Sequence, residues 1–139
     1  MKVIILGKDG QLGQCLSEQF ASAEHELHTT TYTTQLFAKS ECDLSNFQQL
    51  HEMFLTQAPD VIVNAAAYTA VDAAEDNAQL ADTLNHKAVS HLAKLCREFD
   101  STLIHISTDY VFDGRGNTPY SESEPTGPQG VYGVTKLSG

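Results

Sequence analysis

The sequence predicts an α/β fold in which a doubly wound parallel sheet carries helices on both faces. Short apolar or β-branched segments alternate with segments of helical periodicity along the chain. One short segment, residues 61–63, is apolar throughout, as a strand buried on both faces should be. The length of 139 residues, 41% of them hydrophobic, suits a single core. We therefore expect one domain over residues 1–139.

The first elements follow from their residue patterns. Residues 2–6 form a short apolar run that predicts the first strand, and a turn rich in glycine follows it. Helical spacing then predicts a helix over residues 11–23, and a run rich in threonine predicts a second strand over residues 26–32. The apolar stripe of this helix consists of Leu12, Leu16 and Phe20.

A second helix should begin near Ser45. Ser45 and Gln48 have the spacing of a capping box, in which each side chain satisfies an amide at the helix start. Pro59 should end this helix just before the apolar strand at residues 61–63. The apolar stripe of the helix would consist of Phe47, Leu50 and Phe54.

The second half of the chain continues the alternation. Helical spacing predicts a long helix over residues 79–99, and a strand should follow over residues 102–107. Residues 113–128 are dense in Gly, Pro, Ser and Thr, which predicts a loop. A last helix should begin near Val131. The apolar positions of the long helix are Leu84, Ala88, Leu92 and Leu95.

A glycine motif between the first strand and the first helix indicates a Rossmann-like dinucleotide-binding domain. Gly7 permits a tight turn, Gly10 lets the backbone approach a pyrophosphate, and Gly13 lets helix and strand pack closely. The helix start supplies free amides and a positive dipole for the phosphates. Glycines that only the fold requires can produce the same spacing, so the motif alone leaves that explanation open. In its strand–helix context the motif predicts an NAD(P) cofactor.

Two other segments bear on how this cofactor is held. NAD-specific domains commonly place an acidic residue at the end of the second strand, but residues 29–34 contain no carboxylate and no arginine. Both NADPH and NADH therefore remain open as the cofactor. Asn64 and the three alanines after it follow the apolar strand, where small side chains leave room for a flat ligand. The start of an alanine-rich helix would explain this run equally well.

Three polar side chains near the end of the chain predict a carbonyl reductase. Tyr132 and Lys136 are four residues apart on a predicted helix and therefore share one face. A nearby ammonium group stabilises tyrosinate, which makes the phenol a better acid near neutral pH. Thr108 ends a predicted strand, where its hydroxyl can bond a substrate carbonyl oxygen. Hydride would come from the nicotinamide. The alternative is a half-exposed tyrosine beside a solvated lysine.

Composition argues against several other classes of protein. The net charge is -10, and the eight basic residues are scattered, whereas nucleic-acid binders cluster lysine and arginine. No apolar run approaches the roughly 20 residues that span a bilayer, so we expect no membrane segment. The three cysteines are odd in number and widely spaced, which predicts no disulfide framework and a reducing, cytoplasmic setting.

The sequence predicts no metal site. His51 and Glu52 begin like the helix of a zinc protease, but Leu55 occupies the place of the second histidine. A group of three carboxylates could hold a cation, yet a solvated helix face or a helix start explains it better. These carboxylates are Asp72, Glu75 and Asp76.

Four blocks of the sequence resemble the dTDP-4-dehydrorhamnose reductases, a family of the extended short-chain dehydrogenase superfamily. They are residues 7–13 (GKDGQLG), 59–72 (PDVIVNAAAYTAVD), 107–112 (STDYVF) and 131–137 (VYGVTKL). Family members reduce the 4-keto group of a dTDP-linked 6-deoxyhexulose to give dTDP-L-rhamnose, in nucleotide-sugar and cell-surface polysaccharide biosynthesis. The resemblance implies an NAD(P)H-dependent ketoreductase with a dTDP-sugar substrate.

The resemblance also implies roles for individual residues. Tyr132 would be the proton donor, Lys136 its partner, and Thr108 the hydroxyl that completes the catalytic set. Thr108 and Asp109 would lie against the sugar. Tyr132 and Lys136 would also contact the cofactor. The other implied cofactor contacts are Gly7 and Gly13 of the glycine turn, Gly10, Gln11 and Leu12 at the pyrophosphate, Asp43 and Leu44 at the adenine, and Ala67, Tyr68 and Thr69 along the cofactor channel.

The chain departs from the family pattern in two respects. Some members form a metal-linked dimer through a glutamate two residues past the third motif glycine, where this chain has Cys15. We therefore do not expect a magnesium-bridged dimer, although a homodimer stays open. Family chains also continue into a C-terminal part that supplies most of the sugar-nucleotide pocket and that this chain lacks. We expect residues 1–139 alone to turn over little.

Two alternatives to the ketoreductase remain. The first is another sugar-nucleotide epimerase or dehydratase of the same superfamily. A dehydratase usually requires an acidic pair just after the strand-end hydroxyl, and here Asp109 is followed by Tyr110. The second is a non-catalytic NADP-binding regulatory subunit, which would keep the cofactor site and use its surface for a partner.

Overall fold

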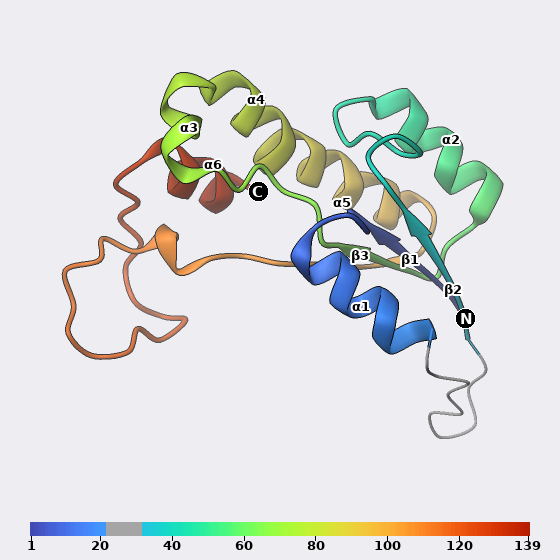
Figure 1. The fold of residues 1–139 in the computed structure, drawn as a ribbon, viewed down its shortest axis with the longest axis horizontal. Helices are drawn as coiled ribbons and strands as arrows, with labels where there is room; N and C mark the ends of the chain where they lie inside the picture. Colours follow the sequence, from blue (N-terminus) through green and yellow to red (C-terminus); the bar gives the residue numbers. More distant parts are fainter. Residues whose placement is uncertain (22–31) are drawn as a thin grey trace. The chain divides into compact units, whose positions relative to one another are not determined.

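A parallel sheet of four strands organises the fold. The computed structural model describes residues 1–21 and 32–139 (Figure 1). The strands, in chain order, are β1 (Lys2–Leu6), β2 (Thr33–Phe37), β3 (Val61–Asn64) and β4 (Thr102–His105). Their order across the sheet is β2-β1-β3-β4. The chain moves from β1 outward to β2 and then returns past β1 to β3. The carboxyl ends of β1 and β3 therefore form a topological switch point, which is where open α/β sheets bind ligands.

The strand register brings the functional segments to one edge of the sheet. Leu6 pairs with Phe37 on one side and with Asn64 on the other, and Asn64 pairs with His105. The last residues of all four strands therefore lie level. Val3 to Leu6 of β1 are all buried, and Ile62 of β3 is completely buried. This burial fits the predicted apolar central strands.

Helices cover both faces of the sheet, as predicted. Helix α1 (Gln11–Ala21) lies on one face, and α2 (Phe47–Gln57) and α5 (Ala88–Glu98) lie on the other (Figure 1). Right-handed crossovers require this arrangement, because the chain reverses its direction across the sheet after β2. Aromatic contacts join α2 to α5 and to Phe99, the residue after α5. The rings of Phe54 and Phe99 are 5.5 Å apart, and Phe47 stacks on His91 at 4.8 Å.

The chain divides into two compact units. Unit 1 comprises Met1–Ala66 and Ser90–Ile106 and contains the sheet. Unit 2 comprises Ala67–Val89 and Ser107–Gly139. Its elements are α3 (Val71–Asp76), α4 (Ala78–Asp82), a π turn (Thr83–Lys87), a 3-10 turn (Asp109–Val111) and α6 (Val131–Ser138).

The prediction for the second strand is wrong where the structure describes it. Strand β2 occupies Thr33–Phe37, and Tyr32 lies outside it. The rest of the predicted strand, residues 26–31, lies outside the described residues, as do residues 22–23 of the predicted first helix. The whole region is rich in threonine, so its composition does not locate the strand within it. Pairing locates β2 at Thr33–Phe37, because this segment is hydrogen-bonded in register with β1.

The capping box predicted for α2 is also wrong. The N-cap is Asn46, whose side-chain oxygen accepts from the amide of Gln49 at 3.1 Å. Ser45 instead donates to the carboxylate of Asp43 in the preceding turn. Asn46 and Gln49 have the same three-residue spacing as Ser45 and Gln48, so the pattern fitted two frames. The helix ends at Gln57, just before Pro59, as expected.

The remaining predictions are close to the structure. The long helix is present as α4, a π turn and α5, and the strand after it ends at His105 rather than Ser107. Residues 113–128 contain no helix or strand, and α6 begins at Val131. Helix α3 and the 3-10 turn were not predicted. Within the described residues, no helix is both long and apolar enough to cross a membrane.

Candidate dinucleotide and catalytic site

The glycine turn of unit 1 contains glycines of two kinds. Gly7 has a φ of +88°, and a Cβ there would lie 2.8 Å from the Cβ of Ala66. A Cβ on Gly13 would overlap the carbonyl oxygen of Gly7. The fold therefore requires both glycines. A Cβ on Gly10 would meet only the Gly7 oxygen, at an ordinary 3.5 Å. Because the fold does not require a glycine at position 10, close approach of a ligand is the better explanation for it.

The start of α1 fits the pyrophosphate of a dinucleotide. Gly10, Gln11 and Leu12 are exposed there. Amides of a first helical turn have no acceptor within the helix, and the helix dipole adds partial positive charge. The predicted contacts Gly7 to Gly13 thus form one open turn at the carboxyl end of β1, and the residues present fit the group.

The loop after β2 lies against this turn. The carbonyl oxygen of Phe37 accepts from the amides of Gly7 at 3.0 Å and Lys8 at 3.1 Å. Further along the loop, the carboxylate of Asp43 accepts from the amide and hydroxyl of Ser45. Leu44 as a whole is only 5% exposed, so it offers little surface to an adenine. The adenine role of both residues stays a prediction.

The carboxyl end of β3 is organised by Asn64. Its side chain is buried, its oxygen accepts from the amide of Ala66 at 3.1 Å, and its nitrogen lies 3.2 Å from Nδ1 of His105. The amide of Ala65 donates to Leu6 at 3.0 Å. Residues 65–70 are neither helix nor strand, so the alternative of an alanine-rich helix start is wrong. The small side chain of Ala66 instead fits against Gly7.

In unit 2, Asn85 joins the predicted cofactor segment to α6. Asn85 lies in the π turn and is completely buried. Its side chain accepts from the amide of Tyr68 at 2.8 Å and donates to the carbonyl oxygen of Tyr68 at 3.1 Å. It also donates to the hydroxyl of Thr135 at 3.2 Å, and that hydroxyl donates to the carbonyl oxygen of Tyr132 at 3.0 Å. Asn85 thereby ties residues 67–69 to the helix that carries Tyr132.

Thr108 and Asp109 begin the 3-10 turn. The hydroxyl of Thr108 accepts from the amide of Tyr110 at 3.3 Å and donates to the carboxylate of Asp109 at 3.3 Å. Thr108 is half-buried and Asp109 is exposed. A hydroxyl and a carboxylate therefore lie side by side, as the predicted sugar contacts require.

Helix α6 places Tyr132 and Lys136 one turn apart. Tyr132 is half-buried, and its ring meets Tyr110 edge-on with centroids 5.5 Å apart. Lys136 is only 5% exposed, and burial lowers its pKa below the ordinary 10.5. The alternative of a solvated lysine is therefore wrong. A Cβ on Gly133 would overlap the carbonyl oxygen of Tyr110, so α6 packs tightly on the turn that Thr108 begins.

Glu75 caps the start of α6. The N-cap position is Gly130, which has no side chain to offer, and Glu75 of α3 accepts from the amide of Val131 at 2.8 Å. A carboxylate is favourable at a helix N-terminus. This contact gives Glu75 the helix-start role that the sequence suggested, at α6 rather than at its own helix.

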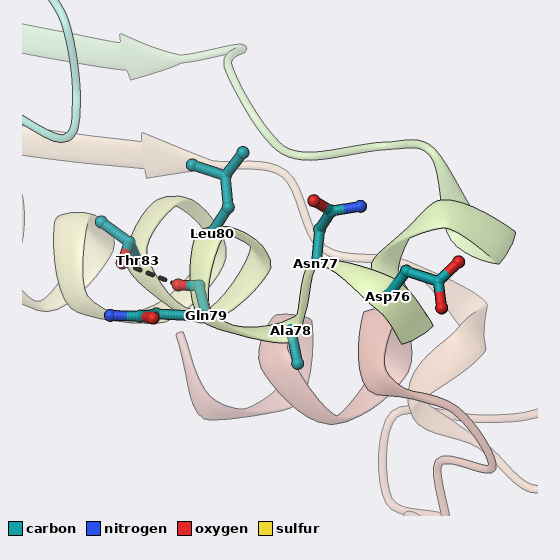
Figure 2. A pocket seen from close by; sticks show the side chains of 6 residues that line it. All are labelled: Asp76, Asn77, Ala78, Gln79, Leu80 and Thr83. Atoms are coloured by element: carbon teal, nitrogen blue, oxygen red, sulfur yellow. Dashed lines mark hydrogen bonds between the residues drawn. The ribbon is translucent and has the colours of Figure 1, made fainter.

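A hollow of about 450 Å³ at the junction of α3 and α4 is not the site. Its six lining residues contain one ionisable group, Asp76. Figure 2 shows that the side chains point in different directions rather than toward one another. The hydroxyl of Thr83 donates to the carbonyl oxygen of Gln79 at 2.8 Å (Figure 2). Over the described parts of the chain, no group of three metal-ligating side chains could hold a metal ion.

Sequence reasoning missed Asn85 and Gly133. Asn85 had a signal, because it is a polar residue on the buried face of a helix, between Ala81 and Ala88. Gly133 had a weaker signal. A glycine inside a helix costs stability and often marks close packing, but its partner Tyr110 lies far away in sequence.

Comparisons with known proteins agree with this geometry. The family model described as RmlD substrate binding domain matches residues 1–139. The dTDP-4-dehydrorhamnose reductase of Shigella flexneri is 41% identical over 143 residues, which cover 100% of this chain and 45% of that protein. The chain thus spans about half the length of the curated relatives it matches.

Two solved structures show the same fold. The dTDP-4-dehydrorhamnose reductase of Clostridium acetobutylicum has a TM-score of 0.88 and 33% identity, over 99% of this chain and 47% of that one. The enzyme from Bacillus anthracis, solved in complex with NADP, has a TM-score of 0.87 and 34% identity, over 99% of this chain and 46% of that one.

Proposed function

The chain belongs to the RmlD substrate binding domain family, and from this premise we propose that the protein is a dTDP-4-dehydrorhamnose reductase. It would reduce the 4-keto group of dTDP-4-dehydro-L-rhamnose, with NADPH or NADH, to dTDP-L-rhamnose. The tight packing of α6 on the turn begun by Thr108 carries this proposal, because α6 is the helix of Tyr132 and Lys136. The names of the relatives support it.

Each unit has its own part in the proposed reaction. Residues 1–139 would serve as an NAD(P)-binding domain that carries the Tyr/Lys pair. The start of α1, at Gln11 and Leu12, would hold the pyrophosphate through amides, and NADP in the Bacillus anthracis structure supports a nicotinamide dinucleotide as the ligand. When bound, NADPH or NADH supplies the hydride. The remaining steps belong to side chains of unit 2.

Those side chains bind the substrate and move a proton. Thr108 would turn its hydroxyl proton from the carboxylate of Asp109 to the substrate carbonyl oxygen, and Asp109 would bind the sugar. Tyr132 would donate its phenolic proton to that oxygen as negative charge develops there. Lys136 would stabilise the resulting tyrosinate. Because Lys136 is almost fully buried, its attraction to tyrosinate is screened less by water than that of a surface lysine.

Replacement of Tyr132 tests the proposal. In the full-length protein, Tyr132→Phe should lower kcat for dTDP-4-dehydro-L-rhamnose by about a hundredfold, because the proton donor is lost. The Kd of NADPH should change little. Tyr110→Phe is the matched control, since it removes a neighbouring phenol but keeps the ring contact with Tyr132. Equal losses in both variants would contradict the assigned role.

The same measurements separate the alternatives. Tight NADPH binding by the wild-type protein, without turnover of any keto-sugar nucleotide, would favour a regulatory subunit. Epimerisation or dehydration without net oxidation of NADPH would favour another enzyme of the superfamily. Steady turnover by residues 1–139 alone would refute the expectation that the fragment is weak.

We also propose a cytoplasmic location, and a homodimer stays open as the assembly. Cys15, Cys42 and Cys96 are all free thiols, as suits a reducing compartment. Cys15 is exposed, and the resemblance implies a metal-binding glutamate in its place in some family members. We therefore do not expect a homodimer bridged by magnesium.

A further inference from the structure

An ion pair joins the phosphate-binding turn to the loop after β2. Nζ of Lys8 lies 2.8 Å from Oε2 of Glu41. The same oxygen accepts from the amide of Ala38 at 2.7 Å. Ala38 is the first residue after β2, and the carbonyl oxygen of Phe37 binds the amides of Gly7 and Lys8. Glu41 is thus held where the turn and the strand end meet.

This place has a known significance in dinucleotide-binding sheets. The adenosine ribose is recognised at the carboxyl end of the second strand, where a carboxylate binds the 2′-hydroxyl of NAD and a cation accommodates the 2′-phosphate of NADP. The sequence located that strand end at residues 29–34 and found no charge there. The structure locates it at Phe37, beside a carboxylate and an ammonium group that are paired with each other.

Both partners are charged at neutral pH. The hydrogen bond from the amide of Ala38, followed by that from Lys8, lowers the pKa of Glu41. The hydrogen bond to Glu41 raises the pKa of Lys8. Glu41 therefore presents a full negative charge that would repel a 2′-phosphate, and Lys8 offsets that charge.

From this geometry we infer that the Lys8–Glu41 pair sets the preference of the protein between NADPH and NADH. The inference rests on the proposed function, since it assumes that the glycine turn binds a nicotinamide dinucleotide. While the pair is intact, its charges cancel and neither dinucleotide is strongly excluded. Neutralising one partner leaves the charge of the other uncompensated. A remaining positive charge then favours NADPH, and a remaining negative charge favours NADH.

Two single variants of the full-length protein test the inference. Fluorescence titration gives the Kd of NADPH and of NADH, and the ratio of the two is the readout. In Glu41→Gln the remaining ammonium group should favour NADPH by about threefold or more relative to NADH. Glutamine keeps an oxygen that can accept from Ala38, so the loop should be preserved. In Lys8→Gln the remaining carboxylate should favour NADH by a similar factor.

A double variant and a control complete the design. Lys8→Gln combined with Glu41→Gln removes both charges and should return the ratio close to that of the wild type. Glu122→Gln removes an exposed carboxylate from the loop at residues 113–128 and should leave the ratio unchanged. A ratio that tracks the sign of the remaining charge cannot come from a merely structural role, because general loosening would weaken both dinucleotides together.

Two kinds of failure are distinguishable. If both single variants bind the dinucleotides with the wild-type ratio, or if the ratio moves against the predicted sign, the inference is overturned and the proposed function stands. If the wild-type protein binds neither dinucleotide, the proposed function fails, and this inference fails with it.

Discussion

At the scale of single residues, the side chain of Asn85 makes three hydrogen bonds to two different segments. It pairs with both backbone polar groups of Tyr68 and with the hydroxyl of Thr135, all from a completely buried position. A buried polar side chain is stable only when it is hydrogen-bonded, and its partners depend on it in turn. The residue is therefore both a structural member of unit 2 and the link between residues 67–69 and the helix of Tyr132.

Asn85→Ala should lower the free energy of unfolding by about 2–3 kcal/mol, because it leaves buried polar groups without partners. Urea denaturation followed by far-UV circular dichroism would measure the change. Asn117→Ala, at an exposed position in the loop, should change it by less than about 0.5 kcal/mol. Similar urea midpoints for the two variants would show that the hydrogen bonds of Asn85 do not stabilise the fold by this amount.

Lys136 makes the stability of the protein depend on pH. Burial lowers its pKa below 10.5, so the folded state holds this proton less tightly than the unfolded state does. The free energy of unfolding should therefore rise as pH increases through the lowered pKa toward 10.5, and should be insensitive to this group at lower pH. Burying the charged lysine thus costs stability at neutral pH.

The difference between the wild-type protein and Lys136→Met isolates this effect. Urea midpoints of both proteins are measured from neutral pH to 10.5. The midpoint of the wild type should rise relative to that of Lys136→Met as pH increases. Burial raises the pKa of Cys42 and of Cys96 to about 11, which acts in the opposite direction, but both thiols are present in both proteins. Curves that stay parallel over the whole range would contradict the burial argument.

At the scale of elements, the glycine turn separates the needs of the fold from the needs of the ligand. Gly7 and Gly13 sit against backbone or against Ala66, with no room for a side chain, whereas Gly10 has room. Substitution of each glycine by alanine should therefore have different consequences.

Gly13→Ala should reduce stability and dinucleotide binding together, because its Cβ would overlap the carbonyl oxygen of Gly7. Gly10→Ala should leave the unfolding midpoint nearly unchanged but raise the Kd of NADPH by about tenfold, the loss of one good phosphate contact. Thermal unfolding and fluorescence titration on the same samples would measure both effects. Full NADPH affinity in Gly10→Ala would place the phosphates elsewhere.

The sequence predicted where helix α6 begins, but not which other elements contact it. Its start at Val131 and the Tyr132–Lys136 spacing followed from the sequence. Its cap by Glu75 and its contact with Tyr110 through Gly133 did not, because both partners lie on other elements. Local patterns report the period of a helix, and only packing reports its neighbours.

At the scale of the whole molecule, the proposed cofactor is linked to stability. A ligand that binds only the folded state adds RT ln(1 + [L]/Kd) to the free energy of unfolding. NADPH at a hundred times its Kd should therefore stabilise the full-length protein by about 2.7 kcal/mol, seen as an upward shift of the thermal midpoint. Gly10→Ala at the same NADPH concentration should lose about half of this stabilisation. An unshifted wild-type midpoint would contradict dinucleotide binding.

Much of the architecture was within reach of the sequence. The alternating elements, the apolar run at residues 61–63 and the glycine turn each depend on residues close together in the chain. The family resemblance is confirmed by the match over residues 1–139. The strand predicted at Tyr32 and the capping box predicted for α2 were wrong for a common reason. In each case two neighbouring frames had equal local propensity, and a partner outside the segment decided between them.

The sequence by itself therefore determined the α/β class and the glycine turn, and it predicts the Thr108, Tyr132 and Lys136 set, since these rest on periodicity, glycine spacing and residue chemistry. The tertiary structure alone decided that Lys136 is buried, that Asn85 ties residues 67–69 to α6, and that Lys8 meets Glu41 at the end of β2. The physical reason is that burial and ion pairing join residues tens of positions apart. Sheet pairing and helix packing bring them together, and no local pattern encodes that contact.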